Sequence, residues 1–532
     1  MTARTTAFAR ADHSTSPPCV TVPRDYNAAA DLVERNLEAG RGERTAFIDD
    51  AGRYSYAELA QRVNRCANAW RRLGLRAEDR VVLLLHDTID FPTAFLGAIR
   101  AGVVPIPCNT LLTAADYRYL LADSRARAVV VSALLAPLVA PLAATSPSLD
   151  HVIVSGDRIE GTLAFGDWLA PESDEAPVAA TTADDVCFWL YSSGSTGSPK
   201  GAVHLHADLI QTAELYARPV LGIGADDVVF SAAKLFFAYG LGNALTFPLA
   251  VGATSVLMAE RPTPAAVFKR LVGEQPTIFC GVPTLYAAML ASADFPPRAK
   301  LGLRRCVSAG EALPADLGRR WRDKTGVDIL DGLGSTEMLH IFLSNHPDDV
   351  CYGTTGRPVP GYAMRVVDEA GNPVAQGEIG ELLVSGPTSS PYYWNNRAKS
   401  LATFLGPWTK SGDKYIVDAD GRYTYCGRSD DMLKVGGVYV SPFEVEAALA
   451  THEAVLEAAV VGHADANELI KPKAFVVLKP GQSPNPALAA ALQDHVKSKL
   501  APFKYPRWIE FVADLPKTAT GKIQRFKLRS RG

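Results

Sequence analysis

A loop of small hydroxyl residues, glycines and one lysine stands out at residues 191–201, with the sequence YSSGSTGSPKG. Backbone N–H groups, hydroxyls and a cation in such a loop are suited to bind a polyphosphate. A P-loop ends in Gly-Lys-Ser/Thr, whereas Lys200 follows Pro199 and precedes Gly201, so a P-loop is not expected. A flexible linker is the competing interpretation, but the apolar run 186–190 leads directly into the loop as a strand would.

Four more segments with chemically active residue types follow along the chain. They are residues 331–337 (DGLGSTE), 410–413 (KSGD), 425–437 (YCGRSDDMLKVGG) and 516–522 (PKTATGK). With the glycine-rich loop, their order and spacing resemble those of the acyl-adenylate-forming superfamily, which includes acyl-CoA synthetases, adenylation domains of peptide synthetases and luciferases. The resemblance covers residues 45–530. One glycine-rich loop would be weak support, whereas five ordered motifs predict the family.

The chemistry of this superfamily explains why such residues are needed. A carboxylate is a poor acyl donor, because its leaving group would be oxide. The resemblance implies that the acid attacks the α-phosphorus of ATP, which forms a mixed anhydride and expels pyrophosphate. Backbone N–H groups, cations and Mg²⁺ must meet the negative charge that gathers there. Coenzyme A then displaces AMP, so no side-chain nucleophile is required, and ATP, Mg²⁺ and coenzyme A are the expected cofactors.

The resemblance also assigns the nucleotide site. The expected phosphate contacts are Ser192, Ser195, Thr196 and Lys200 for the β- and γ-phosphates, and Thr336 for the α-phosphate. The adenine would lie against Gly310, Glu311, Asp331, Gly332 and Leu333, and the ribose against Asp413 and Arg428. Leu333 departs from the family, which usually has an aromatic residue there, so aromatic stacking on the adenine is not expected.

Glu337 and Lys522 complete the predicted catalytic set with Lys200 and Thr336. By resemblance, Glu337 binds Mg²⁺, and Lys522 bridges the carboxylate and the phosphate during adenylation. Without the resemblance, Glu337 would be interpreted as a helix cap and Lys522 as a solvated lysine. Because Lys522 must be cationic, acetylation by a lysine acetyltransferase, reversed by a deacetylase, would stop adenylation.

The charged residues 428–431 separate two regions of different texture, and we predict a domain boundary there. The expected domains are residues 1–429, with the ATP and acid sites, and residues 430–532, a small mobile domain. The resemblance places the hinge at Asp430. Rotation would withdraw Lys522 and bring to the acyl site the residues that admit coenzyme A, namely Lys434, Gly436 and Gly437.

Three segments build the acyl pocket in this superfamily. Here they contribute mostly small and aromatic residues, which are Phe236, Ala238, Tyr239, Ala309, Gly310, Gly334, His340 and Ile341. Such a lining suits a planar ring, and the segments FFAYGLGN and GSTEMLHIFLSN resemble the benzoate-activating members of the superfamily. We therefore predict a ligase that joins benzoate, or a close small aryl acid, to coenzyme A. Phe237 stands where the family often has a histidine, so it can gate a tunnel but cannot transfer protons.

Several alternatives stay open at this point. His340 is either a buried structural histidine or a wall of the pocket, and our hypothesis is that it makes para-substituted benzoates poor substrates. The chain could instead load an aryl acid onto a carrier protein, or activate small fatty or cyclic acids for coenzyme A. It could also be an idle nucleotide-binding scaffold, although the joint presence of the predicted charged site residues argues against that.

The pattern of apolar runs indicates an α/β fold. Continuous runs suit strands buried on both faces, hence a large N-terminal domain of parallel-rich α/β subdomains. The expected strands are 80–85, 102–106, 128–132, 254–258, 277–280 and 305–308, with a helix at 91–100. Short strands at 364–368, 380–384 and 422–425, separated by turn signals, predict a small β-barrel-like subdomain. A small mobile α+β C-terminal domain follows, with helices at 442–450 and 486–500 and strands at 455–461 and 473–478. Residues 1–25 are expected to fray or drape over the surface.

Composition limits the other classes of function. A chain of 532 residues can hold two or more domains, and 48% hydrophobic residues, 21% charged residues and a net charge of −3 are ordinary for a globular protein. No basic excess exists to meet nucleic acid or a membrane surface. Eight scattered cysteines without a CxxC pair, no signal-peptide pattern and no apolar run of membrane length predict a reduced, cytoplasmic protein. A monomer and a homodimer are both open.

Overall fold

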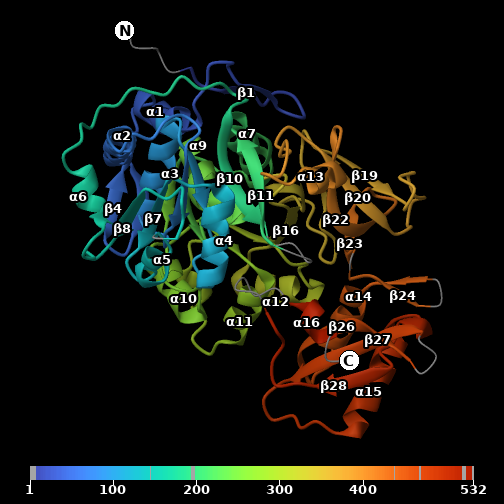
Figure 1. Cartoon of the computed structure of the whole chain (residues 1–532). Helices are drawn as coiled ribbons and strands as arrows, with labels where there is room; N and C mark the ends of the chain where they lie inside the picture. Colours follow the sequence, from blue (N-terminus) through green and yellow to red (C-terminus); the bar gives the residue numbers. More distant parts are fainter. Residues whose placement is uncertain are drawn as a thin grey trace.

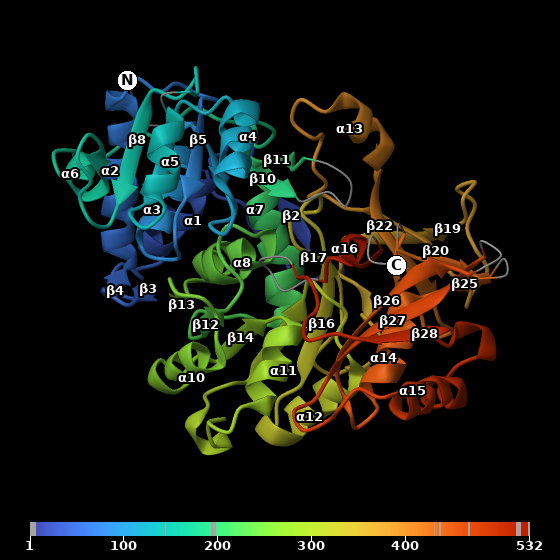
Figure 2. The ribbon, with the colours of Figure 1, turned by 60° about the horizontal axis from the view of Figure 1, so that its bottom comes forward.

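The computed structural model describes residues 7–143, 145–192, 198–429, 431–435, 438–465, 469–517 and 523–529. These residues fold into a large N-terminal body, a small antiparallel sheet at its side and a compact C-terminal unit (Figure 1). In both views the C-terminal unit lies next to the antiparallel sheet and to α12 (Ala315–Thr325) of the body (Figures 1 and 2). The predicted fold class is confirmed by this arrangement of mixed α/β layers followed by a small terminal unit.

A five-stranded sheet, parallel throughout, forms the first layer of the body. Its strand order is β6-β5-β7-β8-β9, with bounds β5 (Arg80–Leu84), β6 (Val104–Pro107), β7 (Ala128–Ser132), β8 (His151–Ser155) and β9 (Leu163–Ala164). In β5, Val81 and Leu83 pack in the cluster that holds α2 (Tyr56–Arg72) and α3 (Asp90–Ala101). The alternate residues Val82 and Leu84 pack with α4 (Ala114–Ser124) on the other face. Burial on both faces explains the continuous apolar run of this strand.

The second sheet of the body has nine strands and positions most of the candidate site. Its order is β18-β17-β16-β15-β14-β12-β13-β3-β4, parallel from β3 to β16 and antiparallel at both edges. The bounds are β3 (Thr45–Asp49), β4 (Gly52–Ser55), β12 (Val228–Ser231), β13 (Thr254–Val256), β14 (Ile278–Gly281), β15 (Arg305–Ala309), β16 (Ile329–Gly334), β17 (Ile341–Ser344) and β18 (Arg357–Pro358). Three helices pack against one face, α10 (Pro264–Gly273), α11 (Pro283–Ala291) and α12. The chain leaves β12, β15 and β16 at the same edge of the sheet, where ligands of open α/β sheets bind.

The glycine-rich loop connects two antiparallel strands, β10 (Val186–Ser192) and β11 (Lys200–Leu205). Ser192 and Lys200 are direct partners in this hairpin, so the two ends of the loop lie side by side. Lys200 begins a strand and not a helix, which agrees with the expectation that this loop is no P-loop. The hairpin lies between the five-stranded sheet and the small antiparallel sheet in Figure 1.

The small antiparallel sheet and the C-terminal unit follow in sequence. The sheet pairs β19 (Ala363–Val367), β20 (Gly380–Ser385), β21 (Phe404–Leu405), β22 (Trp408–Val417) and β23 (Tyr423–Arg428), with α13 (Arg397–Thr403) above it. The C-terminal unit consists of β24 (Leu433–Val435), β25 (Val438–Val440), α14 (Pro442–Ala450), β26 (Val455–Ala464), β27 (Ile470–Leu478), α15 (Pro486–Lys499), β28 (Trp508–Phe511) and α16 (Arg525–Arg529). It has hydrophobic clusters of its own, around Val445, Val460 and Phe475.

Of the two expectations for the N-terminal residues, fraying is wrong for residues 7–25, whereas draping over the surface agrees with the structure, since most of these residues are exposed or half-buried. They form a hairpin of β1 (Arg10–Asp12) and β2 (Cys19–Thr21), which is fixed to the body by polar contacts. The Ala9 N–H donates to the Asp31 carboxylate at 3.1 Å, and His13 lies 2.7 Å from Glu214. Only a few apolar residues of the segment, among them Ala9, Val20 and Val22, pack against the core, so the apolar signal in the sequence was weak. Among the described residues, no helix is both long enough and apolar enough to cross a bilayer.

Candidate active site

A tight turn between β16 and β17 separates two groups of candidate side chains. Gly334 ends β16, and the chain returns at Ile341 as the antiparallel neighbour of the same strand. A Cβ atom on Gly334 would lie 2.7 Å from the carbonyl oxygen of His340, which explains the glycine. Leu339 has a left-handed backbone with φ of 67°, a strained conformation for a leucine. The turn connects Thr336 and Glu337, which are predicted to meet the phosphates, to His340 and Ile341, which are predicted to line the acid pocket. These two sides of the turn are called the phosphate side and the acid side.

On the phosphate side, Glu337 lies between the glycine-rich hairpin and the segment before α13. Its Oε1 accepts hydrogen bonds from the Tyr393 hydroxyl at 2.7 Å and the Ser192 hydroxyl at 3.3 Å. The Lys200 Nζ lies 4.7 Å from the centre of the Tyr393 ring. Burial lowers the pKa of Lys200, Glu337 opposes that shift, and the cations Lys399 and Arg428 add to it. The structure thus brings Ser192, Lys200 and Glu337 together.

The ends of the glycine-rich loop are held by residues that the sequence analysis missed. The Trp394 N–H donates to the Gly201 carbonyl at 2.7 Å, and the Tyr119 hydroxyl donates to the Pro199 carbonyl at 3.0 Å. The Trp394 indole N–H donates to the Asp123 carbonyl at 2.9 Å and its ring lies 4.3 Å from that of Trp189. No motif marks these residues, because they act through contacts with distant parts of the chain.

His204 is a second missed residue, and it holds the main chain of Thr336. Its Nε2 lies 2.8 Å from the Thr336 carbonyl oxygen, and its Nδ1 lies 3.0 Å from Asp208. Because a carbonyl oxygen only accepts, Nε2 carries the proton in this geometry. Both His204 and Asp208 are buried. The position of Thr336 is therefore fixed by a buried two-residue chain that begins at β11.

The predicted adenine and ribose residues lie on β15, β16 and the small sheet. Asp413 and Arg428 face each other across β22 and β23, with 3.2 Å between the guanidinium and the carboxylate. Ala309, at the end of β15, is the register partner of Gly332, and Gly310 and Glu311 follow it with φ of 90° at Gly310. Leu333 faces Leu343 of β17 and packs on the hydrophobic core.

Asp331 is buried, as is Asp413, but the two carboxyl groups differ in their partners. The Oδ1 of Asp331 has no hydrogen-bond partner within the described parts of the chain. Burial raises the pKa of this carboxyl well above its usual range, although the N–H groups of Leu313 and Gly332 oppose the shift. A buried acceptor without a partner needs a donor from elsewhere.

On the acid side, the three predicted pocket segments adjoin one another. Phe236, Phe237, Ala238 and Tyr239 follow β12, and the ring centres of the two phenylalanines lie 4.5 Å apart. The Tyr239 hydroxyl donates to the carbonyls of Val307 at 3.1 Å and Gly281 at 3.2 Å, which ties this segment to the middle of β15 and the end of β14. Ala309 and Ile341 are buried beside it, Ile341 against Gly332.

His340 is surrounded by aromatic rings. The ring centres of Phe247, Tyr216 and Tyr239 lie 4.5, 5.4 and 5.8 Å from that of His340. Its Nε2 is 3.3 Å from the Tyr239 carbonyl oxygen and donates to it, and burial lowers its pKa to about 3. His340 is therefore neutral at physiological pH, and it offers a flat apolar wall more than a charge.

Several predicted residues lie outside the described residues, namely Ser195, Thr196, Asp430, Gly436, Gly437 and Lys522. Lys434 lies in β24, but its side chain is not described.

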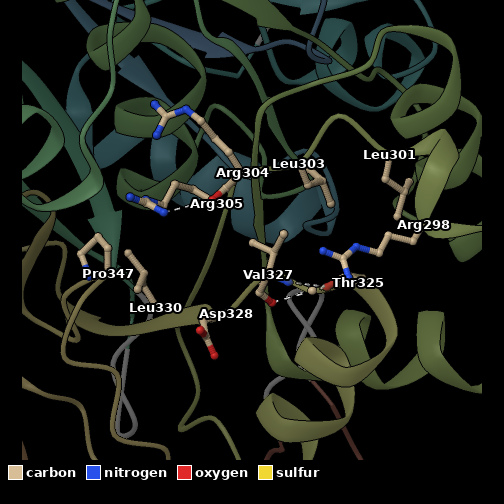
Figure 3. A pocket seen from close by; sticks show the side chains of 11 residues that line it. Arg298, Leu301, Leu303, Arg304, Arg305, Thr325, Val327, Asp328, Leu330 and Pro347 are labelled. Carbon is tan, nitrogen blue, oxygen red and sulfur yellow. Dashed lines mark hydrogen bonds between the residues drawn. The ribbon is translucent and has the colours of Figure 1, made fainter.

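A cavity of about 470 Å³ opens elsewhere, at the amino ends of β15 and β16 (Figure 3). It is lined by three arginines, of which Arg304 is bound to Asp227 at 2.5 Å. In Figure 3 the guanidinium groups of Arg304 and Arg305 point to one side, and that of Arg298 lies on the other. No predicted site residue lines this cavity, and its cations do not converge, so it is not a second candidate site for the same chemistry.

Comparison with known proteins decides the family. Residues 33–394 match the AMP-binding enzyme family, and residues 444–522 match the AMP-binding enzyme C-terminal domain. The chain belongs to the AMP-binding enzyme family. The family predicted from the five motifs is thereby confirmed.

Several AMP-binding enzymes are similar to the whole chain. It is 65% identical to the benzoate–CoA ligase of Thauera aromatica over 98% of this chain and 99% of that protein. Among solved structures, it is 56% identical to a benzoate CoA ligase from Burkholderia xenovorans LB400, with a TM-score of 0.89 over 95% of this chain and 100% of that one. The anthranilate CoA ligase AuaEII, solved with anthranoyl-AMP, is 46% identical with a TM-score of 0.92, over 96% and 98% of the two chains.

The donor set fits the Mg²⁺ that an AMP-binding enzyme uses with ATP. Glu337 offers one carboxylate at the phosphate side, and its Oε2 accepts no hydrogen bond from the described residues. The described residues contain no cluster of three or more acidic, His or Cys side chains that could hold a metal by themselves. Mg²⁺ is commonly held by one or two carboxylates together with substrate phosphates, so a single free carboxylate oxygen suits it.

Proposed function

We propose that this protein is an ATP-dependent acid–thiol ligase that converts benzoate, ATP and coenzyme A into benzoyl-CoA, AMP and pyrophosphate. The observation that carries the proposal is the turn from Gly334 to Ile341. It places the neutral aromatic-lined wall at His340 within a few residues of the phosphate-side carboxylate Glu337. An acid bound on one side of the turn would thus present its carboxylate to a nucleotide phosphate on the other.

In the first half-reaction, a benzoate oxygen attacks the α-phosphorus of ATP, the bond to the bridging oxygen breaks, and pyrophosphate leaves. Lys200, Ser192 and the N–H groups of the loop would bind the departing phosphates, and Thr336 the α-phosphate. Mg²⁺, held by Glu337 and the phosphates, supplies charge neutralisation when bound. Burial lowers the pKa of Lys200, and the Glu337 carboxylate opposes that shift and so favours the charged ammonium.

The nucleoside would be held by three carboxylates and one guanidinium. The unpartnered buried oxygen of Asp331 offers an acceptor for the exocyclic amino group of adenine. Asp413 would accept from the ribose hydroxyls, and Arg428, paired to it at 3.2 Å, would orient that carboxylate. Glu311 and the backbone of Gly310 and Gly332 would border the base, and Leu333 would contribute apolar packing in place of a stacked aromatic ring.

The acid would lie between Tyr239, His340 and the backbone of Ala309, Gly310 and Gly334. A neutral His340 adds no charge that would draw the carboxylate toward the back of the site. The aromatic ring of the acid would then enter the pocket first, and its carboxylate would face the phosphates of ATP. The acids named for similar proteins, benzoate and anthranilate among them, favour an acid with a single aromatic ring.

In the second half-reaction, the sulfur of coenzyme A attacks the acyl carbon and AMP leaves. We propose that the unit from residue 430 onward rotates about Asp430, withdraws Lys522 and brings Lys434, Gly436 and Gly437 to the thiol path. Asp431, next to this hinge, pairs with Arg525 of α16 at 3.6 Å. That contact lies within the C-terminal unit, so it supports rotation as one body.

The finer expectations about partners belong to this proposal. Acetylation of Lys522 by a lysine acetyltransferase should abolish pyrophosphate exchange and leave thioester formation from preformed benzoyl-adenylate intact. Full exchange by a protein acetylated at that residue would contradict the role given to Lys522. We propose the cytoplasm as the location and a monomer or homodimer as the form.

The function is tested by ATP–pyrophosphate exchange with benzoate, 2-aminobenzoate, 4-hydroxybenzoate, cyclohexanecarboxylate, hexanoate and acetate, each repeated as thioester formation with coenzyme A. Exchange led by benzoate, with benzoyl-CoA as product, is the expected result. Exchange without a thioester would indicate transfer to a carrier protein, and exchange led by hexanoate or acetate would refute the acid assignment. No exchange with any acid would indicate an idle nucleotide-binding protein.

A further inference from the structure

Tyr393 contacts the two residues on which the phosphate side of the proposed site depends. Its hydroxyl donates to Glu337 Oε1 at 2.7 Å, the shorter of the two hydrogen bonds which that oxygen accepts. Its ring faces the Lys200 ammonium, which lies 4.7 Å from the ring centre. Tyr393 is 3% exposed, so the hydrogen bond and the cation–π contact are both shielded from water.

The main chain on both sides of Tyr393 is fixed to the same elements. The Ser390 N–H donates to the Glu337 carbonyl at 2.7 Å, and the Trp394 N–H donates to the Gly201 carbonyl at 2.7 Å. The segment therefore bridges the turn after β16 and the strand after the glycine-rich loop. Because these hydrogen bonds already restrict the main chain around Tyr393, its side chain loses little further conformational entropy when it contacts Glu337 and Lys200.

We propose that Tyr393 is a positioning residue for Mg²⁺–ATP, which holds the Glu337 carboxylate by one oxygen and the Lys200 ammonium by its ring. The proposal rests on the proposed function, because it takes ATP and Mg²⁺ to bind at these residues. With Oε1 engaged by Tyr393 and Ser192, the carboxylate plane is fixed and Oε2 is presented to the metal. With Lys200 drawn to the ring, the ammonium is kept beside that carboxylate without forming a closed ion pair with it.

The two contacts can be separated by substitution. Tyr393→Phe removes the hydroxyl and keeps the ring, so Glu337 loses its shorter hydrogen bond while Lys200 keeps its aromatic partner. Tyr393→Leu removes both. Tyr392→Phe is the matched control, because it deletes the same hydroxyl from the neighbouring, 39% exposed tyrosine, whose side chain does not contact Glu337 or Lys200.

The measurement is the binding of Mn²⁺ in the presence of a non-hydrolysable ATP analogue, followed by electron paramagnetic resonance, for the full chain and each variant. We expect Tyr393→Phe to weaken metal binding roughly ten-fold, the effect of losing one hydrogen bond to a carboxylate. Tyr393→Leu should weaken binding of the analogue as well, and Tyr392→Phe should match the wild type. Thermal unfolding of each variant shows whether it is folded at the assay temperature.

A second readout separates positioning from general damage. The Mg²⁺ concentration that half-saturates pyrophosphate exchange should rise in Tyr393→Phe, while thioester formation from preformed benzoyl-adenylate and coenzyme A should keep its wild-type rate. If Tyr393→Phe fails to fold, Ser192→Ala tests the same oxygen and should show a smaller shift in metal affinity. Unchanged metal affinity in a folded Tyr393→Phe protein overturns the proposal, and so does an equal loss in both half-reactions. Metal–analogue binding reports on Tyr393 even if no acid supports exchange, so failure of the proposed function is distinguishable.

Discussion

Replacing His340 with alanine should widen the range of acids that the enzyme accepts. The imidazole is 3% exposed and packs against the rings of Tyr216, Tyr239 and Phe247. Its removal creates a space next to the proposed acid site that none of these large rings can fill without leaving its own contacts. A substituent at the ring position farthest from the carboxylate would then have room.

The size of the effect follows from the packing. Room for one methyl group lowers the free energy of the transition state with the larger acid by about 1–3 kcal/mol. In His340→Ala the ratio of kcat/KM for 4-methylbenzoate to that for benzoate should therefore rise roughly 10- to 200-fold. The same cavity should lower the free energy of unfolding by about 2–4 kcal/mol, the range for large-to-alanine changes in a core. Because the pKa of His340 is about 3, the ratio should not vary with pH near neutrality.

The assay is pyrophosphate exchange with each acid in a separate reaction over a range of concentrations, for the wild type and His340→Ala. His346→Ala is the control, since this half-buried histidine lies in the turn beyond β17, away from the three rings. 4-Methylbenzoate is preferred to 4-hydroxybenzoate, because it tests size without adding a hydrogen bond. An unchanged ratio in a folded His340→Ala protein would refute the view that His340 forms a wall of the acid site.

Three further outcomes follow from the structure. Burial lowers the pKa of His206 to about 4, and its Nδ1 accepts from the Ala28 N–H at 3.1 Å. As the pH falls, the His206 imidazole is therefore protonated in the unfolded chain before it is protonated in the folded protein. The free energy of unfolding, measured by urea denaturation, should therefore fall by up to ~3 kcal/mol between pH 6.5, the ordinary pKa of histidine, and pH 4. His206→Asn should reduce that loss. Arg428→Ala leaves the buried Asp413 carboxylate without its guanidinium at 3.2 Å, and should raise the KM for ATP roughly ten-fold with little change in that for benzoate, as steady-state kinetics can show. Gly334→Ala should lower the unfolding free energy by about 1–3 kcal/mol in thermal melts, since its Cβ would lie 2.7 Å from a backbone oxygen; an unaltered melting temperature would contradict that packing argument.

Strands that are buried on both faces could be predicted from the sequence. Strands that contain exposed or half-buried residues were predicted less accurately. The run 80–85 predicted β5 to within one residue of Arg80–Leu84, because every residue from Val81 to Leu84 is buried. The run 473–478 missed the start of β27 at Ile470, where exposed and half-buried residues break the apolar pattern. The hairpin within residues 7–25 gave only a weak apolar signal, because few of its residues, among them Ala9, Val20 and Val22, pack against the core. Contacts with Asp31 and Glu214 add to the attachment.

The candidate site divides along a similar line. Residues within ordered motifs, such as Lys200 and Glu337, could be named because the motifs resemble a family. Tyr393, Trp394 and His204 could not, because their roles depend on partners far away in the chain. The hydrogen bond between Trp394 and Asp123 spans 271 residues, and that between His204 and Thr336 spans 132. A single sequence contains no local pattern for contacts of this kind.

The contact between the indoles of Trp189 and Trp394, whose planes are tilted by 31°, has a consequence for fluorescence. Their ring centres are 4.3 Å apart, and the Trp394 main chain binds the strand that leaves the glycine-rich loop. If the phosphates of ATP bind that loop as proposed, we expect the surroundings of this pair to change and its ultraviolet emission to change with them. The chain has 7 tryptophans, so subtracting the response of a Trp394→Phe variant isolates the signal of the pair. An emission change of this kind would report nucleotide binding with neither a labelled ligand nor a coupling enzyme.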